Sequence, residues 1–421
     1  NITKTHQIYK NTQKKQGTET DMIKRRLGIY IHIPFCARKC IYCDFLSFGV
    51  DAQNYVNWNG LRKDYINALC IELLSCKHLR DSYIVDTIFI GGGTPSILMP
   101  GDIEKIMDTL RLAFSVSKNA EITIEANPGT LTESKAAEYI HAGINRISIG
   151  LQSANDEELA LLGRIHNYDQ FLVSYDNARE AGFENINIDL ISAVPGQTLH
   201  TYLNSLEKVM KLKPAHISAY SLIVEDGTPL AENDRLLRLI PDEDTDRKMY
   251  EATERLLISG GYNRYEISNY ARPGYECRHN IKYWTLKEYI GFGIGASSFF
   301  NQRRFSNTQD MDEYIRIMTA ASKCGSFEEV SACVNNIRHL DEAADTGHLM
   351  EEFMFLGLRM TKGVSASSFH KKFNRSIYEV YGQVIDRYVS SGHLVNNKGI
   401  ISFTKKGLDV SNSILADFLL D

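Results

Sequence analysis

Six short runs rich in β-branched residues alternate with helix-like stretches in the first half of the chain. The runs span residues 28–33, 85–90, 121–125, 146–150, 185–191 and 216–222, and stretches such as 133–142, 168–181 and 201–211 carry apolar residues at helical spacing. Near-continuous apolar strands joined by helices favour a parallel sheet that helices cover. Because eight units close a full barrel, six predict an α/β fold with a partial (β/α)6, TIM-like barrel.

Unusual turn sequences follow these predicted strands. The turns are Gly91-Gly92-Gly93-Thr94-Pro95, Asn127-Pro128, Gln152-Ser153 and Ala193-Val194-Pro195-Gly196. Three cysteines, Cys36, Cys40 and Cys43, come soon after the first strand. Parallel barrels carry their active sites at the carboxyl ends of the strands. The cysteines and the turns are therefore expected on one face of the sheet.

The spacing C-x3-C-x2-C of these cysteines predicts an iron–sulfur cluster. Cysteine thiolates hold such clusters, usually four to a cubane, so three thiolates leave one iron open to another ligand. Structural zinc is the alternative, but zinc generally takes four ligands, and no further Cys or His pair with finger spacing lies nearby. His32, within the preceding strand, either completes a ligand set or is a core histidine.

Composition and charge narrow the class of protein. Eight cysteines in 421 residues are few for a disulfide scaffold, which indicates a reducing compartment, and Cys70, Cys76, Cys324 and Cys333 are expected to be buried free thiols. The net charge of -5 argues against a nucleic-acid-binding surface. No apolar run reaches the roughly 18 residues of a membrane-spanning helix. Residues 1–27 lack a signal-peptide core, so a cytoplasmic protein is expected.

Four segments are expected along the chain. Residues 1–27 form a basic tail, which is able to touch anionic membrane surfaces transiently but is expected to be solvated. Residues 28–235 form the partial barrel, 236–345 a middle extension, and 346–421 a small helical, winged-helix-like domain. The middle extension begins with a helix from Asp242 to Ser259 and a strand over 265–269, and the last segment contains a hairpin over 393–403.

Three further groups of residues are candidates for ligand binding. The glycine run at Gly92 and Gly93 either lets a ligand approach the backbone or makes a tight turn, and its place beside the cysteines favours the ligand. Glu125, Gln152, Arg164 and Asp189 supply anionic, cationic and hydroxyl-binding groups, although each alone is more often a surface residue or a cap. His279, with Tyr283 and Trp284, offers an axial iron ligand and flat walls for haem, or an ordinary aromatic cluster.

The chain resembles the radical S-adenosylmethionine (SAM) superfamily in its cysteine spacing and its Gly91-Gly92-Gly93-Thr94-Pro95 turn. More narrowly, it is similar to the oxygen-independent coproporphyrinogen III oxidase group. The motifs that carry this similarity are Tyr30-Ile31-His32-Ile33-Pro34-Phe35-Cys36, Ile149-Gly150-Leu151-Gln152-Ser153, Leu162-Gly163-Arg164, Ile188-Asp189-Leu190-Ile191 and Pro195-Gly196-Gln197-Thr198. The similarity covers most of residues 28–310, and the C-terminal segment resembles the small helical domain of that group.

The resemblance implies a cofactor set and assigns residues to it. Cys36, Cys40 and Cys43 would hold a 4Fe–4S cluster, and SAM would chelate the fourth iron through its amino and carboxylate groups. Electron transfer from the cluster would then cleave SAM to a 5′-deoxyadenosyl radical. The positions that match SAM contacts are Tyr30, Tyr42, Gly92, Gly93, Thr94 and Glu125. The positions that match contacts to a second SAM in the oxidase are Gln152, Arg164 and Asp189, here pocket residues.

Two departures separate the chain from the oxidases. Phe45 stands where the oxidases carry a further cysteine, and their N-terminal substrate segment is not recognisable in residues 1–27. By contrast, His279-Asn280-x-x-Tyr283-Trp284 matches the HNxxYW signature of the haem chaperone branch, HemW. That branch implies haem as a ligand, His279 as a candidate haem ligand, and a respiratory protein as haem acceptor.

The resemblance therefore predicts a cytoplasmic haem chaperone that delivers haem to an acceptor, which is expected at the membrane. The alternative is a catalyst of radical oxidative decarboxylation of coproporphyrinogen III propionates. A third interpretation, a radical enzyme that modifies tRNA or a small molecule, fits the narrow motifs less well. Whether the chain is an enzyme at all is left open by the sequence.

Overall fold

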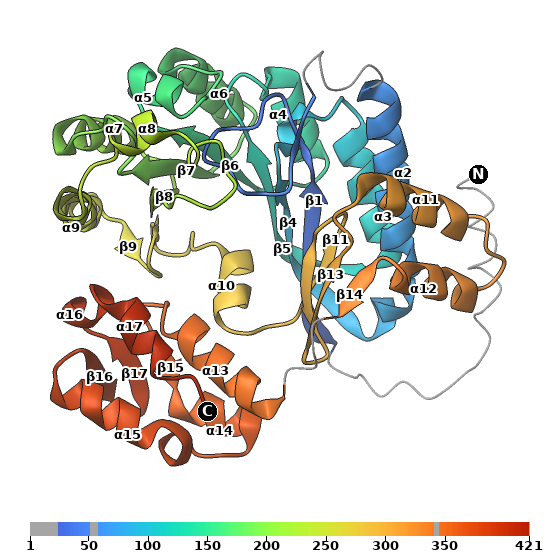
Figure 1. The fold of residues 1–421 in the computed structure, drawn as a ribbon. Helices are drawn as coiled ribbons and strands as arrows, with labels where there is room; N and C mark the ends of the chain where they lie inside the picture. Colours follow the sequence, from blue (N-terminus) through green and yellow to red (C-terminus); the bar gives the residue numbers. More distant parts are fainter. Residues whose placement is uncertain (1–23, 51–57, 341–344, 421) are drawn as a thin grey trace.

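The computed structural model describes residues 24–50, 58–340 and 345–420 (Figure 1). The strands are β1 (Arg25–Ile33), β2 (Phe35–Cys36), β3 (Phe48–Gly49), β4 (Tyr83–Gly92), β5 (Ser115–Ala126), β6 (Arg146–Gln152), β7 (Asn185–Ser192), β8 (His216–Ser221), β9 (Asn263–Arg264), β10 (Asn269–Ala271), β11 (Tyr289–Phe292), β12 (Ser297–Phe300), β13 (Arg303–Asn307), β14 (Arg338–Leu340), β15 (Val364–Ser365), β16 (Leu394–Asn397) and β17 (Ile400–Phe403). The α-helices are α2 (Trp58–Ser75), α3 (Asp102–Ala113), α4 (Glu133–His141), α5 (Asp156–Leu161), α6 (Tyr168–Glu180), α7 (Leu199–Leu212), α8 (Asp234–Leu237), α9 (Glu243–Ser259), α10 (Arg278–Trp284), α11 (Met311–Ala321), α12 (Phe327–Asn335), α13 (Thr346–Gly357), α14 (Ala366–Phe373), α15 (Ile377–Ser390), α16 (Lys405–Leu408) and α17 (Ser411–Ala416).

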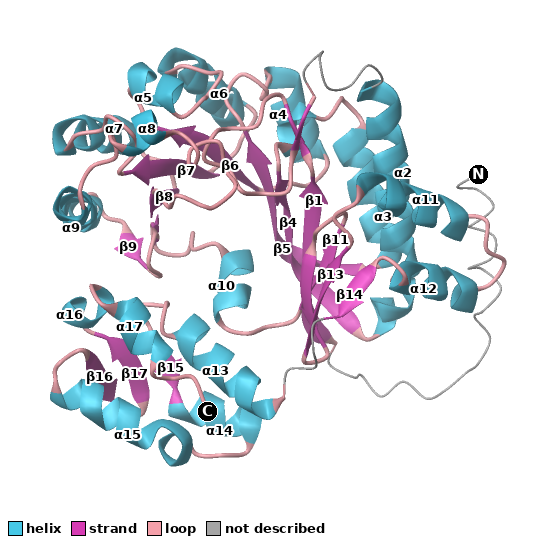
Figure 2. Cartoon of the chain, viewed as in Figure 1, coloured by secondary structure: helices cyan, strands magenta, loops and turns pink. Residues whose placement is uncertain are grey.

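A twelve-stranded sheet, in the order β14-β13-β12-β11-β1-β4-β5-β6-β7-β8-β10-β9, forms the frame of the protein. The strands from β1 through β8 in that order are parallel, and Figure 2 shows helices packed around them. The six strands predicted from the sequence are confirmed, as is the partial α/β barrel with a small C-terminal domain.

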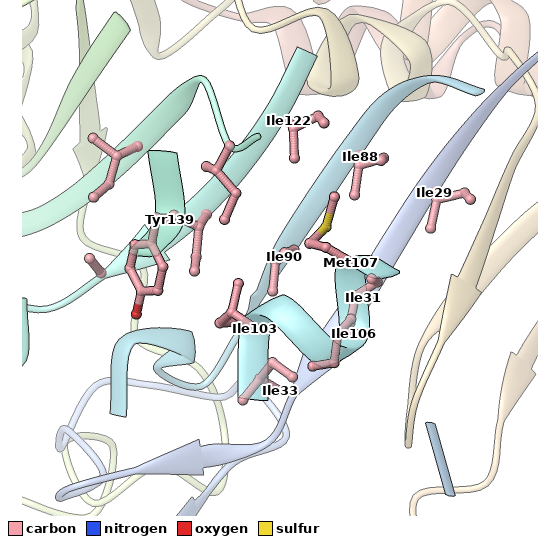
Figure 3. Close-up of a cluster of buried hydrophobic side chains, with 14 of the residues drawn as sticks. Ile29, Ile31, Ile33, Ile88, Ile90, Ile103, Ile106, Met107, Ile122 and Tyr139 are labelled. Atoms are coloured by element: carbon pink, nitrogen blue, oxygen red, sulfur yellow. The ribbon is translucent and has the colours of Figure 1, made fainter. Parts of the chain in front are cut away.

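Alternation along the central strands separates a core face from an inner face of the sheet. Ile29, Ile31 and Ile33 of β1 are fully buried. They lie with Ile103 and Ile106 of α3 in the cluster of Figure 3. A period of two places the intervening residues of each strand on the opposite face. Burial of the isoleucines under the helices therefore turns the remaining side chains of the central strands toward the inside of the barrel.

The region predicted as a middle extension adds strands to both edges of the barrel sheet. β11 pairs in parallel with β1, and β12 and β13 continue the sheet antiparallel. At the other edge β10 pairs antiparallel with β8. The helix predicted from Asp242 is confirmed as α9, because the Asp242 carboxylate accepts a hydrogen bond from Thr245 N at 2.9 Å. The boundaries of the four segments stay a prediction.

The predicted strand over 265–269 is wrong. β9 ends at Arg264 and β10 begins only at Asn269, and the two pair as a short hairpin. Between them the Glu266 carboxylate accepts a hydrogen bond from Ser268 N at 3.0 Å, which stabilises a turn. A side chain that binds its own backbone two residues ahead competes with strand pairing.

The C-terminal domain has its own buried core and a three-stranded sheet in the order β15-β17-β16. The predicted hairpin over 393–403 is confirmed, with Lys398 (φ 52°) and Gly399 (φ 82°) at the turn. Two successive positive φ values are typical of the tight turns that match strand twist. The small winged-helix-like domain thus folds around a core distinct from that of the barrel.

The predicted buried thiols divide into two pairs. Cys70 and Cys76 are buried, whereas Cys324 and Cys333 are only partly buried, which corrects the prediction for that pair. The sulfur atoms of Cys324 and Cys333 lie 3.9 Å apart at the corner between α11 and α12, and both residues pack against the barrel core from outside it. Most of the predicted basic tail, residues 1–23, lies outside the described residues. In the described part of the chain, no helix has the length and apolar character needed to span a membrane.

Candidate functional site

The three cysteines lie on a loop that closes on itself after β1. Phe48 N donates to Pro34 O at 2.7 Å, and Val50 N donates to Cys36 O at 2.8 Å. Burial raises the pKa of the Cys36 thiol and raises the pKa of Cys43 to about 11, and charge on Cys40 raises both further. The three cysteines thus share one loop, and Cys36 and Cys43 are each influenced by Cys40.

Two donors on other strand ends point at the cysteine sulfurs. The Thr94 hydroxyl donates to Cys36 Sγ at 3.4 Å, and Arg164 Nη1 donates to Cys40 Sγ at 3.3 Å. Hydrogen bonds and positive charge beside sulfur favour thiolates, which are the form that binds metal. In the described residues no three His, Cys, Asp or Glu side chains already stand in position to hold a metal ion. The donor set itself, three thiols with cationic and hydroxyl partners, fits an iron–sulfur cluster.

The glycine run packs directly against the cysteine loop. Gly93 N donates to Ile33 O at 2.8 Å, and Thr94 N donates to Phe35 O at 2.7 Å. A Cβ atom at Gly93 would lie 2.7 Å from Phe35 O, and one at Gly92 (φ +112°) would lie 2.5 Å from the His32 ring. Side chains are excluded at both positions. The run is therefore required for loop packing, a reason in addition to the predicted ligand contact.

Tyr30 and His32 form a hydrogen-bonded pair beneath the loop. His32 Nε2 lies 2.8 Å from Leu46 O, which only accepts, so Nε2 carries the proton. His32 Nδ1 therefore accepts from the Tyr30 hydroxyl at 3.0 Å. Burial lowers the pKa of His32 to about 4, which keeps the ring neutral. His32 is thus a satisfied inner-face histidine that fixes both the loop and Tyr30.

Glu125 ends β5 beside the glycine run. Its carboxylate accepts from Gly92 N at 3.0 Å. Burial, and then the nearby charge of Asp189, raise the pKa of Glu125 to about 8. Asp189 on β7 accepts from Ser148 Oγ at 2.9 Å and from Asn187 Nδ2 at 2.8 Å. The inner face thus holds two neighbouring carboxyl groups, and the raised pKa of Glu125 favours its protonated form.

Replacing Glu125 with glutamine is expected to flatten the pH dependence of stability. The folded pKa of about 8 lies above the ordinary value of 4.5, so stability from the protonated carboxyl is lost as pH rises toward 8. Differential scanning fluorimetry from acidic to mildly alkaline pH checks this. The melting midpoint of Glu125→Gln should fall less with pH than that of the wild type, whereas the exposed control Glu207→Gln should follow the wild type. Parallel slopes for Glu125→Gln and wild type would refute the raised pKa.

Gln152 and Arg164 lie at the end of β6, and Arg164 also binds the cysteine loop. Gln152 ends β6 with φ 72°, an unusual value for a residue with a side chain, at a break in register with β7. Arg164 Nη2 donates to Gly150 O and to Asn127 Oδ1, both at 2.8 Å. Backbone strain of this kind collects at functional sites. Tyr42 packs against the buried cluster of Leu162, Ile191 and Val194.

Asn127 is a site residue that the sequence analysis did not select. Besides binding Arg164, its side-chain Nδ2 donates to the Thr94 hydroxyl at 2.8 Å. A pocket opens beside it, lined by Ala37, Arg38, Cys40, Thr94, Asn127, Pro128, Thr130, Gly163, Arg164, Ile165 and His166. The Asn127-Pro128 turn at a strand end was the available signal, but a lone amide gave no reason to prefer it.

His279 lies apart from this group. On α10 it contacts Thr87 of β4 and Glu121 of β5, which precede Gly92 and Glu125 by five and four residues. At about 3.3 Å per strand residue, this is roughly 15 Å toward the amino ends of the strands. The structure therefore gathers the cysteines, the glycine run and Glu125 at one end of the barrel. His279 lies deeper inside it, where the Phe89 ring neighbours both His279 (5.5 Å) and the predicted SAM-contact residue Tyr30 (6.4 Å).

A family profile described as the radical SAM superfamily matches residues 30–209, and one described as the HemN C-terminal domain matches residues 346–410. A curated relative from Lactococcus lactis, named heme chaperone HemW, is 36% identical over 95% of this chain and 99% of its own length. Heme chaperone HemW of Bacillus subtilis is 34% identical over 93% of this chain and 98% of its own length.

Among solved structures, coproporphyrinogen III oxidase (HemN) from Escherichia coli, described as a radical SAM enzyme, is similar in fold. Its TM-score is 0.79 at 22% identity, covering 95% of this chain and 91% of that chain. The similarity extends the shared fold over both the barrel and the C-terminal domain.

Proposed function

This chain belongs to the HemW family of the radical SAM superfamily, and from that membership we propose that it is a haem chaperone that passes haem to an acceptor protein. The observation that carries the proposal is the joint occurrence of full-length similarity to proteins named heme chaperone HemW and the three-cysteine loop with its donors. The acceptor is a haem-requiring respiratory protein. We place the transfer in the cytoplasm, at the membrane surface.

We propose that Cys36, Cys40 and Cys43 hold a 4Fe–4S cluster and that SAM binds beside it. When bound, the cluster supplies an electron for reductive cleavage of SAM. Thr94 and Arg164 stabilise the thiolates through the hydrogen bonds to Cys36 and Cys40. The role of Arg164 suits a guanidinium, which stays charged when buried.

The inner-face residues supply the polar contacts that SAM requires. The backbone at Gly92 and Gly93 and the Glu125 carboxyl face the space beside the loop, and Tyr30 and Tyr42 bound it. Gln152 ends β6, and Asp189 lies within β7, where its charge acts on Glu125. We assign these two, with Arg164, to the pocket in which the cargo or a second SAM binds.

Haem binding without decarboxylation is the result expected of the anaerobically reconstituted protein. Ferric haem is titrated into it and followed by absorbance, and a parallel sample receives coproporphyrinogen III, SAM and a low-potential reductant. We expect about one haem per chain and no vinyl product. Phe45 supports this outcome, because the exposed ring adds no fourth thiolate to the loop.

The competing function is radical decarboxylation of propionate side chains. Formation of vinyl groups from coproporphyrinogen III together with 5′-deoxyadenosine would establish it and overturn the chaperone. A Cys36→Ala variant is the matched control, because any product that depends on the cluster must vanish with it. SAM cleavage without conversion of coproporphyrinogen III does not distinguish the two functions. 5′-Deoxyadenosine and vinyl product are therefore measured separately.

A further inference from the structure

The HNxxYW helix, α10, closes the inside of the barrel beneath the strands. Figure 1 shows it between the central strands and the C-terminal domain. Its first turn is capped by a buried carboxylate, since Arg278 N and His279 N each donate to Glu121 at 3.0 Å. A buried helix end needs such a partner for its unpaired N–H groups. The motif is therefore anchored to β5 by its backbone before any side chain is considered.

Both nitrogens of the His279 ring are occupied. Nδ1 lies 2.9 Å from the Thr87 hydroxyl, and Nε2 lies 2.8 Å from the Tyr283 hydroxyl. The side chain is fully buried, with its ring 5.5 Å from that of Phe89 and edge-on to Tyr283 at 5.0 Å. Burial and the charges of Lys282 and Arg146 lower its pKa to about 3, so the ring is neutral. A haem iron needs a ring nitrogen with an open lone pair and a free approach.

The aromatic rings of Tyr283 and Trp284 are partly buried. Tyr283 packs edge-on to Tyr289 at 4.5 Å, and the Arg359 guanidinium lies 5.1 Å from the centre of the Trp284 ring. Lys282, between them in sequence, pairs with Asp86 at 2.7 Å. The rings expected to hold a porphyrin thus already have neighbours, Tyr289 of the barrel sheet beside Tyr283 and Arg359 of the C-terminal segment beside Trp284.

We propose that His279 is a positioning residue that seals the barrel floor by fixing α10 to the strands, and that haem takes its axial ligand from a side chain outside α10. The inference has two parts. The ligand half, that the axial ligand of haem lies outside α10, rests on the proposed haem-binding function. The floor half, that His279 seals the barrel floor, rests only on contacts among described residues. Thr87, Glu121 and Tyr283 are the partners through which His279 acts.

Removing the Tyr283 hydroxyl, which occupies Nε2 of His279, distinguishes a positioning role of His279 from a role as axial haem ligand. Ferric haem is titrated into wild type, Tyr283→Phe and His279→Gln, with the dissociation constant, the electron paramagnetic resonance spectrum of the haem and the melting midpoint recorded. We expect dissociation constants within about twofold of each other and identical haem spectra. Both variants should melt below the wild type, because each leaves a buried hydrogen-bonding group unpaired.

An axial role for His279 predicts opposite changes in the two variants. Tyr283→Phe would then bind haem more tightly, since no hydrogen bond to Nε2 has to break, and His279→Gln would change the haem spectrum. Either result overturns the inference. If the wild type itself takes up no haem, the proposed function fails and the ligand half falls with it. Unchanged melting midpoints in both variants would refute the floor half independently.

Discussion

Replacing Cys40 with alanine is expected to abolish assembly of the iron–sulfur cluster. Two thiolates cannot hold three irons of a cubane. Arg164 Nη1, which lies 3.3 Å from Cys40 Sγ, would also lose its sulfur acceptor. Iron and sulfide after anaerobic reconstitution should fall from about four per chain to background. The visible absorbance that arises from sulfur-to-iron charge transfer should be lost with them.

Cys324→Ala is the matched control for this experiment. Cys324 is also a free, partly buried thiol, but it lies between α11 and α12 and not on the cysteine loop. Its replacement should leave iron content and absorbance at the wild-type level. Full iron content in Cys40→Ala, or equal loss in both variants, would refute the assignment of the ligands to the loop after β1.

The central barrel was predictable because its pattern is local. Ile29, Ile31 and Ile33 alternate with inner-face residues within one strand, and helical segments separate each barrel strand from the next. In such βαβ units, neighbours in sequence are neighbours in the sheet. The strand β11 was not predicted, because its partner β1 lies more than two hundred residues earlier, as in the pair Gly28 and Tyr289. Nothing in its short sequence indicates that pairing.

The residues of the candidate site also divide into those that the sequence predicts and those that it does not. The cysteines and the residues at Gly92 and Glu125 follow strands whose ends meet, so their proximity follows from the topology. Asn127 acts only through Thr94 and Arg164, and its role appears once both are placed. For His279, the motif indicates the residue but not its surroundings. Its burial depends on Thr87 and Glu121, which lie 192 and 158 residues away.

Glu72 is a buried carboxylate whose partners are equally distant. It lies on α2 with no exposed surface, and it accepts from Gly293 N at 2.9 Å, Asn307 Nδ2 at 2.8 Å and the Tyr314 hydroxyl at 2.6 Å. Burial raises its pKa. These donors come from the end of β11, from β13 and from α11. Glu72 therefore fastens the added strands to the helix that covers β1.

Replacing Glu72 with alanine is expected to destabilise the protein by about 3 kcal/mol or more, because each buried donor left unpaired costs about 1–3 kcal/mol. Urea unfolding of wild type and variant, compared at equal slope, measures the loss. The exposed helical residue Glu207 provides the control, and Glu207→Ala should change the unfolding free energy by less than about 0.5 kcal/mol. A Glu72→Ala variant as stable as the control would mean that water replaces the carboxylate at no cost, and the added strands would then be held by their pairing with β1 alone.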